Sequence, residues 1–363
     1  MTARMRSGAF ATLVGLGAQH LIGEIADPLF VASHGRLDLT KPRRIYGILN
    51  ERCNLRCQGC PCWRLSEYQR EMPAKEWIAL LSDLKSFLGT YHVNFSGGEP
   101  LLRKDLFEIL TFCRDSGIHA GLTTSGAILR DKQARELVEA RLFNLNVSVD
   151  GATAATHDAQ RGVRGAFAKA MRAIALMREH AANIGAHVPI VIKPTVTRLN
   201  VGEMPSLVAL AQGMGCSVLL QPVSDWGTPE TPKLWIEDFD TLHAVIAELV
   251  ALQRSGHAIL NTREQLEDWV RHFRRLPTAA KSRACTVGLD TLMVVPNGDV
   301  HNCDRWAALG NVRREPIRQI WSRARLQRLE SLACTRGCTE TCSTRRPLAQ
   351  RIRGAVRLLR AEP

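Results

Sequence analysis

The sequence lacks an uninterrupted apolar run of the length that a membrane-spanning helix requires. Its most apolar N-terminal stretch, residues 9–18, follows Arg4 and Arg6 in the manner of a signal peptide, but Gln19 and Glu24 soon interrupt it. Apolar residues nevertheless recur there with helical spacing, at Phe10, Leu13, Val14, Gly17, Leu21 and Ile25. We therefore expect an amphipathic helix of a cytoplasmic protein, with export as the alternative.

Acidic and aromatic side chains are both scarce near the C-terminus. From Arg313 onward there are thirteen arginines and four glutamates, so this segment supplies +9 of the net charge of +13. Residues 345–360 place apolar side chains on one helical face, namely Leu348, Ile352, Ala355, Val356 and Leu359. Such a helix can lie on an anionic membrane, contact nucleic acid or pack on its own domain. The absence of an aromatic stacking platform disfavours nucleic acid.

The cysteines lack the two-pair spacing of a usual zinc site. In a chain of 363 residues, eleven cysteines at short spacings indicate metal binding more than disulfides. The first group is Cys53, Cys57 and Cys60, with no second pair nearby. Iron–sulfur clusters select thiolates, and a four-iron cluster normally uses four. Three thiols therefore predict a cluster with one open iron, with structural zinc or inert thiols as alternatives.

Strand and helix patterns alternate six times, which predicts parallel strands joined by crossover helices. The expected strands cover residues 44–50, 91–95, 118–123, 144–149, 188–196 and 216–222. Six such units predict an α/β fold with an open, partial (β/α)6 TIM-like barrel. The first cysteine group follows the first strand. Loops at the carboxyl ends of barrel strands carry the chemistry of such folds, so we expect the active site there.

A second group of cysteines lies toward the end of the chain, at Cys285, Cys303, Cys334, Cys338 and Cys342. Asn297-Gly298 lies between two β-type runs, which predicts a hairpin that brings the first two of these cysteines together. Five thiols are enough for one four-ligand cluster with one spare and too few for two. We expect a single auxiliary cluster in a small cysteine-rich C-terminal domain, with a zinc ribbon as the alternative.

These motifs resemble those of the radical S-adenosylmethionine (SAM) enzymes. The resemblance rests on Cys53-Asn54-Leu55-Arg56-Cys57-Gln58-Gly59-Cys60 and on Gly97-Gly98-Glu99-Pro100 after the second strand. It implies that Cys53, Cys57 and Cys60 hold a 4Fe–4S cluster whose open iron binds SAM. An electron from this cluster then cleaves SAM to a 5′-deoxyadenosyl radical. The late cysteines resemble the auxiliary-cluster domain called SPASM, in a form closer to its shortened version, twitch, which implies one auxiliary 4Fe–4S cluster.

The resemblance also implies where SAM is held. A glycine-loop carbonyl of Gly97 or Gly98, together with Glu99, would accept hydrogen bonds from its ammonium group. Ser148-Val149-Asp150-Gly151, His157-Asp158 and Arg161-Gly162 resemble the fourth-strand end and the following loop of the peptide- and sugar-modifying branches. Polar side chains at the ends of three strands are further candidates for SAM contacts: Thr124, Ser125, Ser148 and Lys193. Strand-end capping is the structural alternative for each.

Two positions depart from the family pattern or add to it. The residue before the third cysteine is usually aromatic or bulky, whereas here it is Gly59, so we expect adenine to be held elsewhere, near Trp63. Cys62 is an additional thiol after Pro61. We expect it not to be a cluster ligand, because a fourth thiolate would close the iron that SAM needs.

The expected function is oxidative modification of a peptide or small natural-product substrate, by dehydrogenation or bond formation. An electron donor such as flavodoxin or ferredoxin would supply the reducing electron. Two alternatives are radical modification of a lipid precursor at the membrane surface and a non-catalytic iron–sulfur electron carrier or sensor. Oxygen-sensitive clusters favour the cytoplasm, with peripheral contact to an anionic membrane as an addition.

The same patterns predict five segments. Residues 1–42 form an N-terminal amphipathic extension, and residues 43–222 form the partial barrel. A helical bridge at 223–284 leads to the auxiliary-cluster domain at 285–342, and residues 343–363 form a basic C-terminal helix.

Overall fold

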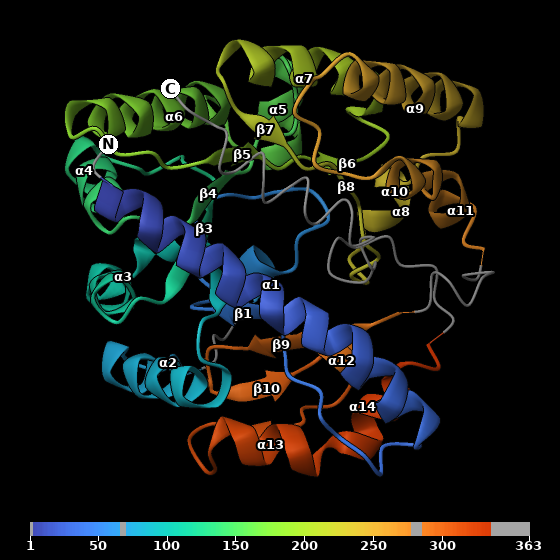
Figure 1. Ribbon diagram of the computed structural model, residues 1–363. Helices are drawn as coiled ribbons and strands as arrows, with labels where there is room; N and C mark the ends of the chain where they lie inside the picture. Colours follow the sequence, from blue (N-terminus) through green and yellow to red (C-terminus); the bar gives the residue numbers. More distant parts are fainter. Residues whose placement is uncertain (1–2, 66–69, 277–284, 335–363) are drawn as a thin grey trace.

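A computed structural model of the chain describes residues 3–65, 70–276 and 285–334, and its centre is one nine-stranded sheet (Figure 1). The strand order is β11-β10-β9-β1-β2-β3-β4-β5-β7, and the six expected barrel strands run parallel in it. They are β1 (Arg44–Ile48), β2 (His92–Ser96), β3 (His119–Thr124), β4 (Asn144–Val147), β5 (Ile190–Ile192) and β7 (Ser217–Val218). The predicted α/β partial barrel is therefore confirmed.

The last two predicted strands are shorter than expected. The run 188–196 is divided into β5 and β6 (Thr195–Val196), and β6 pairs with β8 (Gln221–Pro222) in a separate two-stranded sheet. Pro194 lies at the break. Proline has no N–H to donate to a strand ladder, so the main sheet ends before it.

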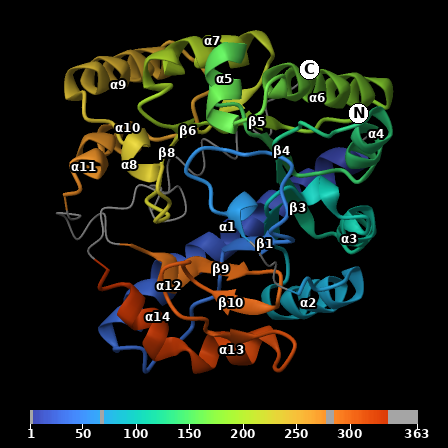
Figure 2. The same cartoon turned by 180° about the vertical axis from the view of Figure 1, so that it is seen from behind.

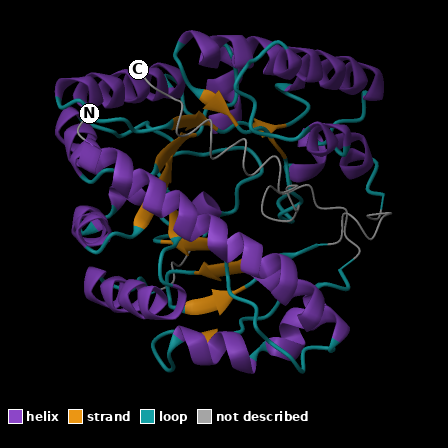
Figure 3. Ribbon diagram, in the orientation of Figure 1, coloured by secondary structure: helices purple, strands orange, loops and turns teal. Residues whose placement is uncertain are grey.

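Helices cover the outer side of the sheet (Figure 3). The expected crossover helices are α2 (Ala74–Leu88), α3 (Leu106–Asp115), α4 (Asp131–Glu139), α6 (Ala166–Asn183) and α7 (Met204–Gly213). One further helix, α5 (Ala154–Arg161), replaces the expected loop after β4. The Thr153 side chain caps it by accepting a hydrogen bond from the Thr156 N–H, and it ends at Gly162 with a left-handed φ of 67°.

Alternate side chains divide the sheet into two faces. One face packs against the helices, as shown by Phe95 and Leu122, which are fully buried, and by the edge-on contact between Trp77 of α2 and Phe95. The opposite face is partly exposed and carries polar residues, including Asn94 and Thr123. We call this second surface the inner face.

The predicted hairpin is present and extends the same sheet. It consists of β9 (Thr291–Val294) and β10 (Asp299–His301), which run antiparallel around a turn at Gly298, where φ is 90°. The strand β9 also pairs in parallel with β1, with Tyr46 opposite Met293, and β11 (Gly310–Asn311) completes this edge. The cysteine-rich segment is thus continuous with the barrel.

The remaining helices lie around these two parts. The bridge contains α8 (Thr231–Leu234), α9 (Phe239–Arg254), α10 (Arg263–Glu267) and α11 (Trp269–Phe273). The segment after residue 285 adds α12 (Val287–Asp290), α13 (Ile317–Arg323) and α14 (Arg325–Ser331). Short 3₁₀ helices occur at η1 (Cys62–Arg64), η2 (Pro100–Leu102) and η3 (Val201–Glu203). The five segment boundaries that the sequence suggests stay a prediction.

The N-terminal helix α1 (Ala3–Ala32) crosses β1 and β9 (Figures 1 and 2). The Gln19 side-chain amide donates to the carbonyls of Leu88 and Thr90, just before β2. In the described part of the chain, no helix has the length and apolarity needed to cross a membrane. The basic segment predicted at 343–363 lies outside the described residues.

Candidate functional site

The loop that follows β1 carries Cys53, Cys57 and Cys60 and is held by the end of α5. The backbone N–H of Arg56 donates to the Arg161 carbonyl at 3.1 Å, and that of Gln58 donates to the Gln160 carbonyl at 2.9 Å. The Gln58 side-chain amide donates to the next free carbonyl, that of Ala159, at 2.9 Å. The last carbonyls of a helix have no partner within it, so α5 uses its own end to fix the thiol loop.

Gly97 and Gly98 hold a second loop directly against the first. The Gly98 N–H donates to the Asn50 carbonyl at 2.9 Å, and the Glu99 N–H donates to the Arg52 carbonyl at 2.8 Å. A Cβ at Gly97 would stand 2.5 Å from the Asn50 carbonyl oxygen, and one at Gly98 would collide with the carbonyls of Glu51 and Arg52. Only glycine allows this approach, which joins both motifs into one cradle.

Glu99 lies beneath this cradle with 1% of its surface exposed. One carboxylate oxygen accepts hydrogen bonds from the Leu101 N–H (3.2 Å) and the Thr124 hydroxyl (2.7 Å). The other accepts from the Ser125 N–H (2.9 Å) and hydroxyl (2.6 Å). The structure therefore brings Glu99, Thr124 and Ser125 together, in contacts that fix the glycine loop. Their direct contact with a cofactor stays a prediction.

Ser148 and Lys193 lie at neighbouring strand ends. The Ser148 N–H donates to the Thr124 carbonyl, and the Lys193 N–H donates to the Val147 carbonyl, each at 2.9 Å. Both side chains are partly exposed, in contrast to the buried Thr124. The ends of β3, β4 and β5 thus form one continuous polar edge beside the thiol loop.

Arg161 connects α5 to the thiol loop and to Asp150, which follows β4. Its Nε lies 2.6 Å from one Asp150 oxygen, and its Nη2 donates to the other at 2.9 Å. Its Nη1 donates to the Sγ of Cys57 at 3.7 Å. Burial raises the pKa of the Cys57 thiol, and the guanidinium opposes this effect. A buried cation therefore favours the thiolate form of Cys57.

The other thiols of the loop differ in acidity. Burial raises the pKa of Cys53 to about 11. A hydrogen bond from the Cys62 side chain lowers the pKa of Cys60 to about 6, and the same bond raises the pKa of Cys62. The Cys60 and Cys62 side chains thus lie close together, and the exclusion of Cys62 from the cluster ligands stays a prediction.

Gly59 and Trp63 have local structural roles. Gly59 has a left-handed φ of 74°, and a Cβ there would stand 2.7 Å from a methyl group of Leu234. A larger residue here would adopt a strained backbone conformation and would have to displace the Leu234 side chain. The indole N–H of Trp63 donates to the Cys57 carbonyl at 2.9 Å, and the Arg64 guanidinium stacks 4.1 Å from the ring centroid. Trp63 thus stays beside the loop, and its contact with adenine stays a prediction.

The thiol loop carries Cys53, Cys57 and Cys60, all partly buried. No three His, Cys, Asp or Glu side chains of the described residues converge tightly enough to hold one metal ion. Ligands of a cluster bind different irons and so lie further apart than the ligands of one ion. Cys53 still interacts electrostatically with Cys57 and Cys60. That these three thiols hold a 4Fe–4S cluster with one iron left for SAM stays a prediction.

Ser331 connects the segments that carry the late cysteines. Its hydroxyl accepts a hydrogen bond from the side chain of Asn302, the residue before Cys303, at 2.8 Å. Gly288 packs so closely that a Cβ there would stand 2.5 Å from the Ser331 hydroxyl. The Cys334 N–H donates to the Ser331 carbonyl at 3.3 Å. Cys303 and Cys285 are thus one and three residues from positions that lie against Ser331, namely Asn302 and Gly288. Cys334 contacts Ser331 directly.

The remaining ligand candidates are Cys338 and Cys342, which lie outside the described residues. Cys285 is described and partly buried, three positions before Gly288. Assignment of the auxiliary ligands among the five late cysteines stays a prediction.

A chain of hydrogen bonds on the inner face was not anticipated from the sequence, and we call it the amide ladder. His92 bonds Asn144 (3.1 Å), Asn144 donates to Asn146 (3.0 Å), and Asn146 donates to Asn94 (3.0 Å). The side-chain amides of Asn94 and Asn146 both donate to the Thr123 hydroxyl oxygen, each at 3.0 Å. Burial lowers the pKa of His92 to about 4, so the ladder is neutral at pH 7. Alternation along the strands, which places these residues on one face, was the signal that could have revealed it.

Comparison with known proteins agrees with this architecture. Residues 48–204 match the family model of the radical SAM superfamily, and residues 285–344 match that of SPASM, an iron–sulfur cluster-binding domain. The Fe-coproporphyrin III synthase of Methanosarcina barkeri is 28% identical over 76% of this chain and 72% of its own length. The PqqA peptide cyclase of Methylocella silvestris is 27% identical over 78% of this chain and 74% of its own.

A solved structure shares the fold at low identity. It is that of Streptococcus suis SuiB bound to precursor peptide SuiA, which matches with a TM-score of 0.63 and 17% identity. The match covers 80% of this chain and 66% of that one. This similarity concerns the fold alone.

Proposed function

Because this chain belongs to the radical SAM superfamily and carries a SPASM iron–sulfur cluster-binding domain, we propose that it oxidatively modifies a peptide or another polar natural product. The reaction is a dehydrogenation or the formation of a new bond. When bound, SAM and the clusters supply a 5′-deoxyadenosyl radical and an acceptor for the electron left on the substrate.

The chain's own residues hold and orient these groups. Cys53, Cys57 and Cys60 bind the SAM-cleaving cluster, and the backbone of Gly97 and Gly98 lies open to the ammonium group of SAM. Glu99 fixes this backbone through Thr124 and Ser125. The polar edge at Ser148 and Lys193 faces the rest of the cofactor, where hydroxyl and ammonium groups suit a ribose and a carboxylate.

The observation that carries the proposal is the continuity of the sheet. In one cross-strand row, His301 of β10 lies opposite Met293 of β9, Met293 opposite Tyr46 of β1, and Tyr46 opposite Asn94 of β2. This row joins the strand that precedes Cys303 to β1, which leads into the thiol loop. Because β10 is antiparallel to β9, Cys303 follows it on the side of the amino end of β9, whereas the thiol loop follows the carboxyl end of β1. We infer that the substrate lies on the inner face of the sheet that connects these two segments.

The amide ladder favours a neutral, hydrogen-bonding substrate. The Thr123 hydroxyl oxygen already accepts two hydrogen bonds, so its own proton is left to donate to a ligand on the inner face. The ladder contains no charged side chain, which suits a peptide amide better than the carboxylates of a coproporphyrin or the hydrocarbon of a lipid. Among the relatives compared, the peptide cyclase is thus the better guide to substrate class.

Deuterium transfer from fractionated extracts tests this proposal. The reconstituted protein is incubated with SAM, dithionite and extracts of cells grown in deuterated medium, separated into aqueous and lipid fractions. We expect deuterium in 5′-deoxyadenosine with the aqueous fraction, and loss of the signal after that fraction is treated with protease. Transfer from the lipid fraction alone would contradict the proposal, since it would make a lipid precursor the substrate.

Thr123→Val tests the role of the ladder in the same assay. Removal of the hydroxyl should lower deuterium transfer by about tenfold, because one directed hydrogen bond to substrate is lost. SAM cleavage in the absence of substrate should be unchanged, since the Thr123 side chain lies on the inner face and has no hydrogen bond to Glu99, which Thr124 binds from the other face. Thr123→Ser keeps the hydroxyl and is the matched control. Equal transfer by the Val and Ser variants would exclude this contact.

A further inference from the structure

The helix α1 binds the rest of the protein through only one narrow side. Gly23, Ala26, Asp27 and Phe30 are buried there. A Cβ at Gly23 would collide with the Arg43 guanidinium, so this contact is as close as glycine permits. The sequence marked a different stripe as the apolar face, and Leu21 and Ile25 of that stripe are exposed instead.

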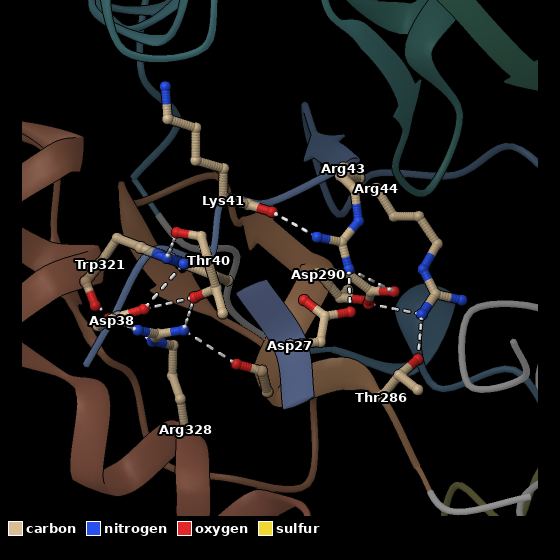
Figure 4. Close-up of polar contacts among 12 residues, drawn as sticks. Asp27, Asp38, Thr40, Lys41, Arg43, Arg44, Thr286, Asp290, Trp321 and Arg328 are labelled. Carbon is tan, nitrogen blue, oxygen red and sulfur yellow. Dashed lines mark hydrogen bonds and ion pairs between the residues drawn. The ribbon is translucent and has the colours of Figure 1, made fainter. Parts of the chain in front are cut away.

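Buried ion pairs fix this orientation (Figure 4). Asp27 of α1 lies 2.6 Å from Arg43, which also faces Asp290 at 3.8 Å just before β9. Beyond the helix, Asp38 pairs with Arg328 of α14, whose side chain is fully buried and stacks on Phe30 with 4.9 Å to the ring centroid. Breaking such pairs is costly because it leaves a buried charge without a partner. These pairs therefore hold the opposite side of α1 toward solvent.

That outward side is strongly apolar. Leu21, Ile22, Ile25 and Leu29 are 54%, 59%, 67% and 40% exposed, and helical spacing places them on one stripe. The loop after α1 adds Leu37 and Leu39, also exposed. Seven of the thirteen large hydrophobic residues that are exposed among the described residues fall between positions 21 and 39. Such a concentration marks an interaction surface.

Exposed cations lie at the C-terminal end of this surface. Arg36 and Lys41 are exposed after α1, and Glu24 is the sole exposed carboxylate among the described side chains from 15 to 41. An anionic partner complements this excess of positive charge.

We propose that the outward stripe of α1, together with Leu37 and Leu39, docks this protein on the surface of an anionic lipid bilayer. Apolar side chains enter the boundary between headgroups and acyl chains, while the flanking cations contact lipid phosphates. Because α1 crosses the N-terminal ends of β1, β2 and β9, the bilayer lies opposite the edge that carries the thiol loop. The active-site edge thus faces away from the membrane.

Vesicle flotation of the reconstituted holoprotein tests this proposal. We expect binding to vesicles of phosphatidylcholine with phosphatidylglycerol, weaker binding to phosphatidylcholine alone, and release by salt. The double variant Ile22→Ser/Ile25→Ser should bind about tenfold more weakly, since two apolar side chains are lost from the docked surface. The matched control is Ile184→Ser/Leu326→Ser, whose positions are 58% and 59% exposed elsewhere on the protein. This control should bind as the wild type does.

Four results would overturn the proposal. The first is that the protein does not bind anionic vesicles, and the second is that both double variants lose vesicle binding equally. The third is that binding depends on residues 345–363 but not on Ile22 and Ile25. The fourth comes from sedimentation without lipid, where a wild-type dimer that the α1 variant dissociates would show that a second copy covers this stripe.

Discussion

Replacement of Arg161 by glutamine is expected to lower the midpoint potential of the SAM-cleaving cluster by on the order of 50–100 mV. The substitution removes a buried cation that donates to the Cys57 sulfur and leaves the Asp150 carboxylate without its charged partner. Both changes disfavour the added electron, so reduction and SAM cleavage become harder. Redox titration followed by electron paramagnetic resonance measures the shift directly.

Asp150→Asn separates this electrostatic effect from a structural one. It removes the neighbouring negative charge and should raise the potential, in the opposite direction to Arg161→Gln. Arg161→Lys keeps the charge and should stay near the wild-type value. Shifts of the same sign in Arg161→Gln and Asp150→Asn would mean that the pair only supports the fold.

Gly162→Ala is expected to displace the thiol loop and reduce the iron bound at this site. Gly162 has a left-handed φ of 67°, and an added Cβ would collide with the carbonyl of Arg56. The backbone strain costs about 1–2 kcal/mol, and the overlap with a rigid backbone adds about 1–3 kcal/mol. Iron content, SAM affinity and thermal unfolding should all fall.

The matched control is Gly165→Ala. Gly165 has a comparable φ of 79°, but no atom beyond its own neighbours in the chain lies within 4 Å of the position that its Cβ would take. This variant should show the backbone strain in thermal unfolding while keeping iron content and SAM affinity. If Gly165→Ala lost iron to the same extent as Gly162→Ala, the close contact with Arg56 would have no special role.

The positions of the main elements were predictable because strand and crossover periodicity is a local property. Gly97 and Gly98 were identified by their motif and by its place after the second strand, and close backbone approach explains why glycine is required there. The role of Glu99 was harder to foresee. Sequence suggested an acceptor for a cofactor, whereas the structure shows four hydrogen bonds to Leu101, Thr124 and Ser125. Thr124 and Ser125 are 25 and 26 positions away, at the end of β3, and such distant partners have no signature in local sequence.

Two other features depend on contacts distant in sequence. Arg161 was recognised as part of a motif, but its contact with Cys57 spans 104 positions and required α5, which the sequence did not predict. The orientation of α1 was missed because this helix is apolar on two sides. Periodicity identified the stripe with the larger aliphatic residues. The helix packs against the rest of the protein through the other stripe, which contains Gly23 and Asp27. There a glycine and a buried ion pair allow close contact.

The central claim is that Cys53, Cys57 and Cys60 form the SAM-cleaving centre. The most direct test compares wild type with the variant that has alanine at all three positions. Each reconstituted protein is given SAM and dithionite, and release of 5′-deoxyadenosine is measured. We expect about eight irons per chain and 5′-deoxyadenosine from the wild type, in keeping with two four-iron clusters. The triple variant should keep about four irons at the auxiliary site and release none. Continued release of 5′-deoxyadenosine by the triple variant would contradict the assignment of this loop.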